Sequence, residues 1–394
     1  MSKIDELLKN EKVEWKKLEE VCEIKRGRVI SKIYLEKHKG EFPVYSSQTR
    51  NNGEIGRIST YDFDGEFATW TTDGAYAGTV FYRNGKFSVT NICGLIEPKD
   101  NKKLLVKFIV YWLQIEAKKH VKGGSGNPKL MSNVVEGIKI PIPSIETQEK
   151  IVKTLDKFTD YVTELQAELQ ARTKQYEYYR NLLLSEEYLN KLAENPEILG
   201  GGYRLKLITL GAIGEIQMCK RILKDQTTSK GAIPFYKIGT FGKIADSFIS
   251  RGLFNEYKKK YSYPKKGEIL ISASGTIGRT VIFDGEDAYF QDSNIVWVSH
   301  NEEIVINKYL YYLYQVINWN PSTGGTINRL YNYNLKNIKV ILPPIEIQNK
   351  VVDILDKFQS LLSEIKGLLP QEIEQRQKQY EYYRERLLDF PKNN

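Results

Sequence analysis

The chain has 394 residues, of which 41% are hydrophobic and 12% aromatic, and it carries a net charge of +9. This length predicts more than one domain, each with a substantial core. No apolar run approaches membrane-spanning length, the segment MSKIDELLKN is charged, and Cys22, Cys93 and Cys219 share no disulfide or metal spacing. We therefore expect no signal peptide, membrane anchor or metal site, and a reduced, cytoplasmic location.

The positive charge is concentrated in two parts of the chain. Residues 1–144 have 24 basic and 18 acidic side chains and residues 203–344 have 19 and 11, whereas 145–202 have 7 and 11 and 345–394 have 8 and 9. We predict globular domains over the two basic segments and helical spacers over the other two. A basic surface indicates binding of a polyanion, with a generic basic surface as the alternative.

The first globular segment opens with a polar stretch, residues 1–12, for which we expect a short helix. A basic loop is predicted at Lys25, Arg26 and Arg28. An apolar strand then precedes the loop SSQTRNN, residues 46–52. Arginine, glutamine and asparagine are side chains that read base edges, while Asn-Asn-Gly also favours a tight turn. The sequence leaves both interpretations of this loop open.

The rest of this segment predicts strands and one buried helix. Residues Phe67–Pro98 are rich in strand-forming side chains broken by glycines, and Asn84-Gly85 predicts a hairpin turn. Residues Leu104–Val121 predict a helix with a strongly apolar face. The loop Gly123–Leu130 contains glycines that allow close approach of a phosphate backbone or serve only as a connector.

The first spacer carries a regular apolar ladder. Apolar residues alternate in steps of four and three from Ile151 to Leu183, with Arg172 as the one interruption. This rhythm predicts a long helix that packs along another helix, although an ordinary core helix is the alternative for a single copy. The segment Glu164–Ala171 is a tandem ELQAELQA repeat.

The second globular segment repeats the order of the first. A basic stretch, the AIPFYKIGTFG segment, Ile269–Gly285 and an apolar helix over Tyr309–Ile317 occupy corresponding places, and GTIGRTV stands against GAYAGTV. The polar loops of the two segments differ. One scaffold with two sets of loops predicts two different targets.

The second spacer repeats the first and includes an exact copy of part of it. KQYEYYR occurs at Lys174–Arg180 and again at Lys378–Arg384, and LDKF occurs at Leu155–Phe158 and Leu355–Phe358. The second ladder has one extra step of four near Gly367 and Pro370. This stutter predicts a kink or a restart of the helix at Pro370.

These motifs resemble the specificity subunit of type I restriction-modification enzymes over nearly the whole chain. The resemblance rests on I-x-x-P-x-P-x-x-E-x-Q-x-x-I-V and its counterpart LPPIEIQNKVV, followed by LDKF and KQYEYYR, behind GSGNPKL or GGTINRL. It implies a pseudo-symmetric α+β protein in which an antiparallel coiled coil separates two target recognition domains. It also implies that each domain reads half of a bipartite DNA site. The helices would dock two methyltransferase subunits, and restriction subunits would join them.

We expect DNA contacts from polar and basic residues in the loops of both domains. The candidates are Lys25, Arg26, Arg28, Ser46, Ser47, Gln48, Arg50, Asn51, Thr71, Thr72, Asn127, Lys129, Lys220, Arg221, Lys237, Ser272, Ser274, Arg279, Asn328 and Arg329. For the coiled coil and partner docking they are Leu155, Phe158, Val162, Leu165, Leu169, Tyr176, Tyr179, Leu355, Phe358, Leu362, Ile365, Tyr380 and Tyr383.

No motif for catalysis is found in the sequence. It lacks an Asn-Pro-Pro-Tyr/Phe tetrapeptide and a G-x-x-x-x-G-K-[ST] loop, and we find no convincing glycine motif for S-adenosylmethionine. We expect S-adenosylmethionine, ATP and Mg on partner subunits and no cofactor on this chain. The alternatives are a self-sufficient methyltransferase or nuclease with a divergent active site, and a coiled-coil scaffold that binds only proteins.

Overall fold

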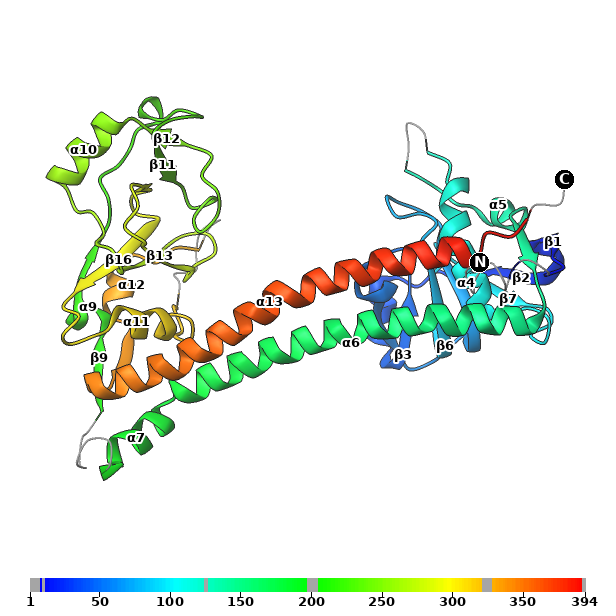
Figure 1. Ribbon diagram of the computed structural model, residues 1–394, viewed down its shortest axis with the longest axis horizontal. Coiled ribbons are helices and arrows are strands. Elements are labelled where there is room, and N and C mark those ends of the chain that lie inside the picture. Colours follow the sequence, from blue (N-terminus) through cyan, green and yellow to red (C-terminus); the bar gives the residue numbers. More distant parts are fainter. Residues whose placement is uncertain (1–7, 9–10, 124–126, 197–204, 321–327, 392–394) are drawn as a thin grey trace. The chain divides into compact units, whose positions relative to one another are not determined.

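The computed structural model describes residues 8, 11–123, 127–196, 205–320 and 328–391. The chain divides into two compact units, one formed by residues 1–167 and 369–394 and the other by residues 168–368 (Figure 1). Each unit contains one globular domain and parts of two long helices. The predicted helix over residues 1–12 falls mostly outside the described residues. No helix in the described ranges is long and apolar enough to cross a membrane.

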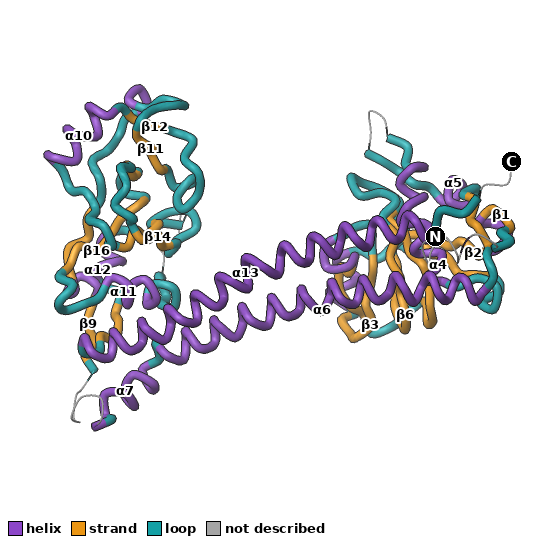
Figure 2. Tube along the Cα trace, in the orientation of Figure 1, coloured by secondary structure: helices purple, strands orange, loops and turns teal. Residues whose placement is uncertain are grey.

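The first domain is built on a six-stranded sheet with the order β2-β7-β5-β6-β3-β4. Figure 2 shows the strands of this domain in orange, with β2, β3 and β6 labelled. A separate pair, β1 and β8, joins the start of the domain to its end. The strands are β1 (Glu14–Lys17), β2 (Cys22–Arg26), β3 (Lys39–Tyr45), β4 (Glu54–Ile58), β5 (Phe63–Thr71), β6 (Val80–Val89), β7 (Cys93–Pro98) and β8 (Lys139–Ile142). The helices are α2 (Leu18–Val21), α3 (Lys32–Lys37), α4 (Val106–Glu116) and α5 (Ser132–Glu136), with 3-10 turns at Arg50–Gly53 and Ala117–His120.

Helix α4 supplies much of the core of this domain, as its apolar face predicted. Phe108, Ile109 and Leu113 are buried, and they belong to the same cluster as Trp70 of β5. Full burial of one such side chain contributes about 1.5–3 kcal/mol.

Two local predictions for the first domain are wrong. Asn84 and Gly85 lie in the middle of β6, where Gly85 pairs with Gly65 of β5, and the connection between these strands falls at residues 72–79. Gly85 has φ +92 and Gly65 has φ +136. The glycine pair therefore lets the ladder continue through a conformation that normally marks a turn. Lys25 and Arg26, predicted in a loop, lie on strand β2.

The second domain has a four-stranded sheet of order β10-β16-β13-β14 and a three-stranded sheet of order β12-β11-β15. The pair β17-β9 corresponds to β8-β1 of the first domain. The strands are β9 (Lys206–Thr209), β10 (Gly214–Gln217), β11 (Ile233–Tyr236), β12 (Phe248–Ile249), β13 (Ile269–Ser272), β14 (Thr280–Ile282), β15 (Tyr289–Phe290), β16 (Ile295–His300) and β17 (Lys339–Leu342). The helices are α7 (Glu186–Glu194), α9 (Leu210–Ile213), α10 (Arg251–Lys260), α11 (Asn307–Leu313) and α12 (Asn332–Lys336), with a 3-10 turn at Lys224–Gln226.

The two domains match through one turn, with a shift from the alignment that the sequence predicted. Gly78 N donates to the carbonyl of Thr71 at 2.8 Å, and Gly278 N donates to that of Ser272 at 3.0 Å. Gly78 and Gly278 also have the same φ, +80. In the structure Gly278 is therefore equivalent to Gly78, whereas the alignment of GTIGRTV with GAYAGTV made it equivalent to Ala77.

The two long helices are α6 (Ile145–Leu183) and α13 (Ile345–Leu387). Every ladder position that we assigned to the coiled coil is buried or half-buried, which confirms the heptad pattern. Of the kink or restart predicted for the second helix, the restart is wrong, because α13 is continuous and contains Pro370, while the kink stays a prediction. Pro370 has no N–H to donate, and it lies beside the boundary between the two units at residues 368 and 369.

The glutamine of the E-x-Q motif fastens each spacer helix to the domain before it. Gln148 and Gln348 are fully buried. The side chain of Gln148 accepts from Leu105 N at 3.0 Å and donates to the carbonyls of Lys103 at 2.8 Å and Pro143 at 3.0 Å. Gln348 repeats all three bonds with Ile306 N, Ile304 O and Pro343 O at 2.9, 3.0 and 2.8 Å. The motif therefore acts as a structural clamp.

The aspartate of LDKF provides a second attachment in each unit. Asp156 on α6 accepts from Lys107 at 2.6 Å and from Tyr111 at 2.5 Å, both on α4. Asp356 on α13 contacts Lys308 and Tyr312 of α11 in the same way. The repeated sequence motif is thus a repeated domain-to-helix joint.

Candidate nucleic-acid interface

The loop between β3 and β4 is anchored to the first domain by polar contacts. Ser46 is 9% exposed and its hydroxyl accepts from Thr90 at 2.9 Å. The Ser47 hydroxyl donates to the carbonyl of Ile92, and the Gln48 amide donates to that of Glu54. These three candidate side chains are therefore engaged in holding the loop. The tip of the loop, residues 50–52, is therefore the part that is available to a ligand.

The tip consists of exposed polar residues in an unusual backbone conformation. Arg50, Asn51 and Asn52 are exposed. Asn51 has φ +49, Asn52 φ +52 and Gly53 φ +82, so three consecutive residues are left-handed. Asparagine and glycine tolerate this region best, which supports the tight-turn interpretation. The same turn leaves the three exposed side chains free to contact DNA.

Most other candidate cations of the first domain already have intramolecular partners. Lys25 pairs with Glu23 at 2.7 Å and with Glu97 at 3.4 Å. Arg28 pairs with Asp62 at 3.0 Å, and Arg26 donates to the carbonyl of Asn91 at 3.1 Å. In contrast, Arg50 has no carboxylate partner within the described ranges.

Four hydroxyl candidates are buried and support loop geometry instead of direct contact with DNA. Thr71 and Thr72 are 0% exposed, and their hydroxyls donate to the carbonyls of Tyr76 and Ile92. Ser272 is 1% exposed and Ser274 4% exposed, and they donate to Thr276 O and Asn294 Oδ1. Polar residues at the end of a strand are commonly exposed, but here neighbouring loops cover them.

The candidates before the spacer helices occupy equivalent positions in the two domains. Lys129 forms a backbone bridge to Asp73, and Arg329 forms one to Ser274. The side chain of Lys129 also approaches Asp73 at 3.7 Å. Asn127, Asn328 and Arg329 are exposed. The structure thus brings this loop against the turn after β5 or β13 in each domain.

The cations of the second domain are also largely paired. Arg221 contacts Asp292 at 2.9 Å and Lys237 contacts Asp246 at 2.9 Å. Arg279 donates to the carbonyl of Phe241 at 2.9 Å. Lys220 is exposed and lies 5.2 Å from the ring centre of Tyr261.

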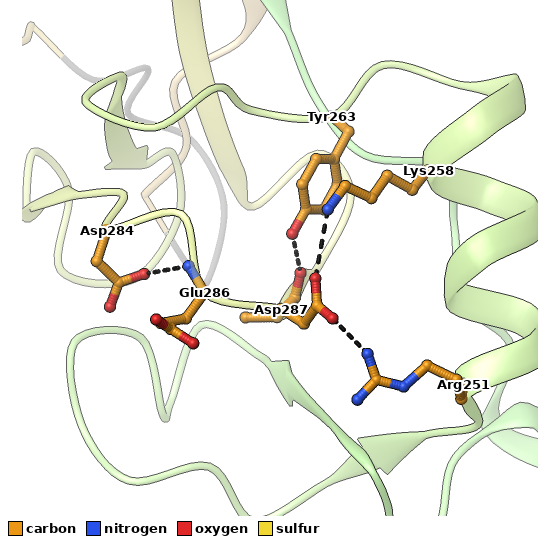
Figure 3. Close-up of polar contacts among 7 residues, drawn as sticks. Arg251, Lys258, Tyr263, Asp284, Glu286 and Asp287 are labelled. Atoms are coloured by element: carbon orange, nitrogen blue, oxygen red, sulfur yellow. Dashed lines mark hydrogen bonds and ion pairs between the residues drawn. The ribbon is translucent and has the colours of Figure 1, made fainter.

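Helix α10 carries a charged cluster that the sequence did not indicate. Figure 3 shows Arg251 and Lys258 on either side of Asp287, with Lys258 Nζ at 3.3 Å and Arg251 in an ion pair. Desolvation acts to raise the pKa of Asp287, but hydrogen bonds from Lys258 and Arg251 lower it overall. Both cations are therefore partly neutralised within the domain.

A second residue missed by the sequence is Arg83 on β6, which is only 3% exposed. It donates to the carbonyl of Asn52 at 2.7 Å and to Thr69 Oγ1 at 3.2 Å. Burial lowers its pKa. Since its partners come from different strands and a loop, no local sequence pattern could have revealed them.

The two long helices, α6 and α13, form the second candidate surface. In the first unit Phe158 and Tyr383 stack with ring centres 5.2 Å apart, and in the second unit Tyr179 and Phe358 stack at 5.3 Å. In the first unit Arg376 also lies 5.2 Å from the ring centre of Tyr161, so α6 and α13 run antiparallel there. Several large side chains on the helices remain exposed, namely Tyr161, Tyr178, Leu182, Leu361, Leu368 and Tyr382.

No group of three or more histidine, cysteine, aspartate or glutamate side chains in the described parts of the chain is placed to hold a metal ion. Burial raises the pKa of the thiols of Cys22, Cys93 and Cys219 to about 12. A pKa this high leaves little of the reactive thiolate at neutral pH.

Comparison with known proteins agrees with this architecture. The model of the type I restriction modification DNA specificity domain matches twice, at residues 10–175 and 205–375. A Haemophilus influenzae protein named as a type I restriction enzyme specificity subunit is 45% identical over 401 residues, covering 98% of each chain. A Mycoplasma pneumoniae type I specificity subunit is 33% identical over 383 residues, covering 96% of this chain and 98% of its own.

Solved structures share the fold at lower sequence identity. The S subunit of a type I restriction-modification system from M. genitalium has a TM-score of 0.53 and 17% identity, covering 98% of both chains. A chain from a type I R-M system solved to explain complex assembly has a TM-score of 0.57 and 16% identity, covering 95% of this chain and 97% of its own. With two matching domains and full-length relatives, the chain belongs to the family of type I restriction-modification DNA specificity subunits.

Proposed function

We propose that this chain gives a type I restriction-modification complex its DNA sequence specificity by reading a bipartite site, one half-site per globular domain. The observation that carries the proposal is a single scaffold present twice with different loops. Gly78 and Gly278 form the same turn, yet the surrounding polar side chains differ between the domains. Two such surfaces on one chain suit a site with two unlike halves.

The charge distribution supports a role in DNA binding. The globular segments carry the whole positive excess of the chain, and exposed cations such as Arg50, Lys220 and Arg329 lie near their loops. Contacts from cations to phosphates provide affinity that falls with salt, while contacts to base edges provide sequence. The paired cations contribute less to this attraction because their charge is partly neutralised.

The partners in this proposal are two methyltransferase subunits, which dock on α6 and α13, and restriction subunits that join them. Exposed Tyr178, Leu361, Leu368 and Tyr382 offer apolar contact area on these helices. Methylation and cleavage are then carried out by the partner subunits, which bind S-adenosylmethionine, ATP and Mg, while this chain acts as a non-catalytic subunit in the cytoplasm.

Selection of DNA by the assembled complex tests this proposal. The chain and its methyltransferase subunit are purified together and incubated with random duplex DNA, and the bound fraction is sequenced. We expect two specific blocks separated by a stretch without preference. Binding without any sequence preference would contradict the proposal. Binding of S-adenosylmethionine by the isolated chain would favour a self-sufficient methyltransferase, and a complex without DNA affinity would favour a protein-binding scaffold.

A further inference from the structure

Arg83 is a buried cation that forms no ion pair within the described part of the chain. Its side chain is 3% exposed, and no carboxylate in the described ranges forms an ion pair with it. One guanidinium nitrogen, Nη1, is buried and has no hydrogen-bond partner among the residues that the structure describes. Burial of an unpaired charge is unfavourable, and a buried donor without an acceptor adds to the cost. Such a residue needs a role that an apolar side chain could not fill.

The contacts of Arg83 converge on the tip of the loop between β3 and β4. Its NH2 donates to the carbonyl of Asn52 at 2.7 Å, and its guanidinium lies over the ring of Tyr45 at 3.6 Å and that of Phe81 at 4.6 Å. Contact with aromatic faces offsets part of the desolvation. A Cβ added at Gly53 would lie 3.0 Å from Arg83 NH2, so the turn is closely fitted to the guanidinium.

The shared scaffold does not require this charge. Counted from the matched glycines Gly78 and Gly278, the equivalent of Arg83 in the second domain is Phe283, which is 4% exposed. An apolar residue, directly after the end of β14, thus fills the equivalent buried position. At this one position the arginine is therefore particular to the first domain.

The turn held by Arg83 has the form expected of a reading element. Asn51, Asn52 and Gly53 are left-handed, and backbone conformations of this kind concentrate at ligand-contacting sites when the surroundings fix them. Arg50 is exposed and has no carboxylate partner among the described residues, unlike Lys25 and Arg28. An exposed arginine beside exposed amide side chains can discriminate guanine and adenine edges.

We propose that the Arg50–Gly53 turn determines base preference in the half-site read by the first domain, and that Arg83 is the positioning residue that holds this turn. The inference rests on the proposed function and deepens it. Arg50 contacts a base edge, while Arg83 holds the peptide of Asn52 in place through a hydrogen bond to its carbonyl. Loss of either residue should therefore lower base discrimination at the same positions of the DNA site.

The test compares variants of the full chain assembled with the methyltransferase subunit, using a duplex library randomised in both half-sites. The variants are Arg50→Ala, Arg83→Met and Arg83→Lys. Arg57→Ala is the matched control, because Arg57 is an exposed arginine of the same domain paired with Glu54 at 2.8 Å. Thermal unfolding of each variant reports on folding.

We expect Arg50→Ala to lower discrimination at one or two positions of a single half-site by about ten-fold or more, because a bidentate base contact contributes this much. Arg83→Met should weaken the same positions, and Arg83→Lys should restore part of the preference by restoring a donor and a charge. The other half-site and the Arg57→Ala variant should keep the wild-type preference.

The outcomes separate this inference from the proposed function. If the wild-type complex selects no sequence, the proposed function fails. If it selects a bipartite site and Arg50→Ala leaves both half-sites unchanged, or weakens all sequences equally, the base-reading turn is wrong. Because Arg50 is exposed, its replacement tests the turn even if Arg83→Met unfolds the domain. If the Arg83→Met variant is folded and keeps the wild-type base discrimination in both half-sites, the positioning role of Arg83 is wrong.

Discussion

Phe158 stacks on Tyr383 with ring centres 5.2 Å apart and an angle of 22° between the ring planes. In the other unit the counterpart rings, Phe358 and Tyr179, stack at 5.3 Å and 9°. The LDKF motif of each spacer therefore meets the KQYEYYR motif of the other. This reciprocal contact gives the two repeated motifs a shared physical explanation, because each copy supplies the partner of its counterpart.

Replacement of these rings should weaken the helix pair in a coupled way. We expect Phe158→Ala and Tyr383→Ala each to destabilise the chain, and the double variant to lose less than the sum by ~0.5–1.5 kcal/mol, the usual value of an aromatic pair. Denaturant unfolding of the four proteins gives this coupling energy. Phe158→Ala combined with Tyr178→Ala is the control, because Tyr178 is in the other unit and 63% exposed. Equal coupling in both pairs would contradict direct stacking.

The buried glutamines Gln148 and Gln348 should contribute strongly to the stability of the folded chain. Gln148→Ala leaves the N–H of Leu105 and the carbonyls of Lys103 and Pro143 without this partner. We expect a loss on the order of 2 kcal/mol or more, because buried groups left unpaired are expensive. The matched control is Gln166→Ala on the same helix, where the side chain is exposed. Similar unfolding midpoints for the two variants would show that the clamp contributes little.

The ELQAELQA segment should set the spacing of the recognised half-sites. Deleting one unit, Glu164–Ala167, shortens the helix by about 6 Å and rotates its end by ~40°. We expect the unread gap between half-sites to change while the bases of each half-site stay the same. Sequencing of the methylated sites measures both. An unchanged gap in an active deletion variant would refute a role of this repeat in spacing.

The three thiols should be unreactive in the folded chain. Burial raises the pKa of Cys22, Cys93 and Cys219 to about 12, from a usual 9.0. At pH 8 a thiol reagent should therefore modify these residues about a thousand-fold more slowly than in denaturant. A rapid reaction with any one of them in folded protein would contradict its buried position.

The same pKa values give a pH dependence with a definite sign. Because the folded pKa lies above the unfolded one, this contribution to stability is fully present below pH 9 and is lost as the pH rises toward 12. The free energy of unfolding should fall across this window, and substitution of Cys93 by alanine should reduce the fall. Urea unfolding at stepped pH values measures the effect, and an identical fall in the variant would exclude Cys93 as a source.

The sequence revealed the features of this fold that depend on nearby residues. The ladder from Ile151 to Leu183 predicts a long helix because its spacing follows helical geometry, and the structure confirms it. Asn84-Gly85 was misleading, because the opposing Gly65 lets a turn-like pair continue as strand. Periodicity therefore located the helices, while turn signals depended on a strand partner that a local pattern does not contain.

The candidate site was harder to predict because burial and pairing are decided by distant segments. Thr71 and Thr72 are expected in a loop that contacts DNA, but both are buried, and their hydroxyls donate to the carbonyls of Tyr76 and Ile92. No sequence motif marks Arg83, because its partner Asn52 lies 31 positions away. Arg50 and Asn51 of the exposed turn are candidates from the sequence alone, whereas the buried contact that holds this turn appears only in the folded chain.

The most direct test of the account is methylome sequencing of cells that express this chain with its cognate methyltransferase subunit, compared with cells that lack the chain. We predict a new methylated motif with two specific blocks separated by an unread gap. Exchange of the loop residues 46–53 for another sequence should change one block and leave the other intact. A motif with one continuous block, or a change in both blocks on this exchange, would contradict the assignment of one half-site to each domain.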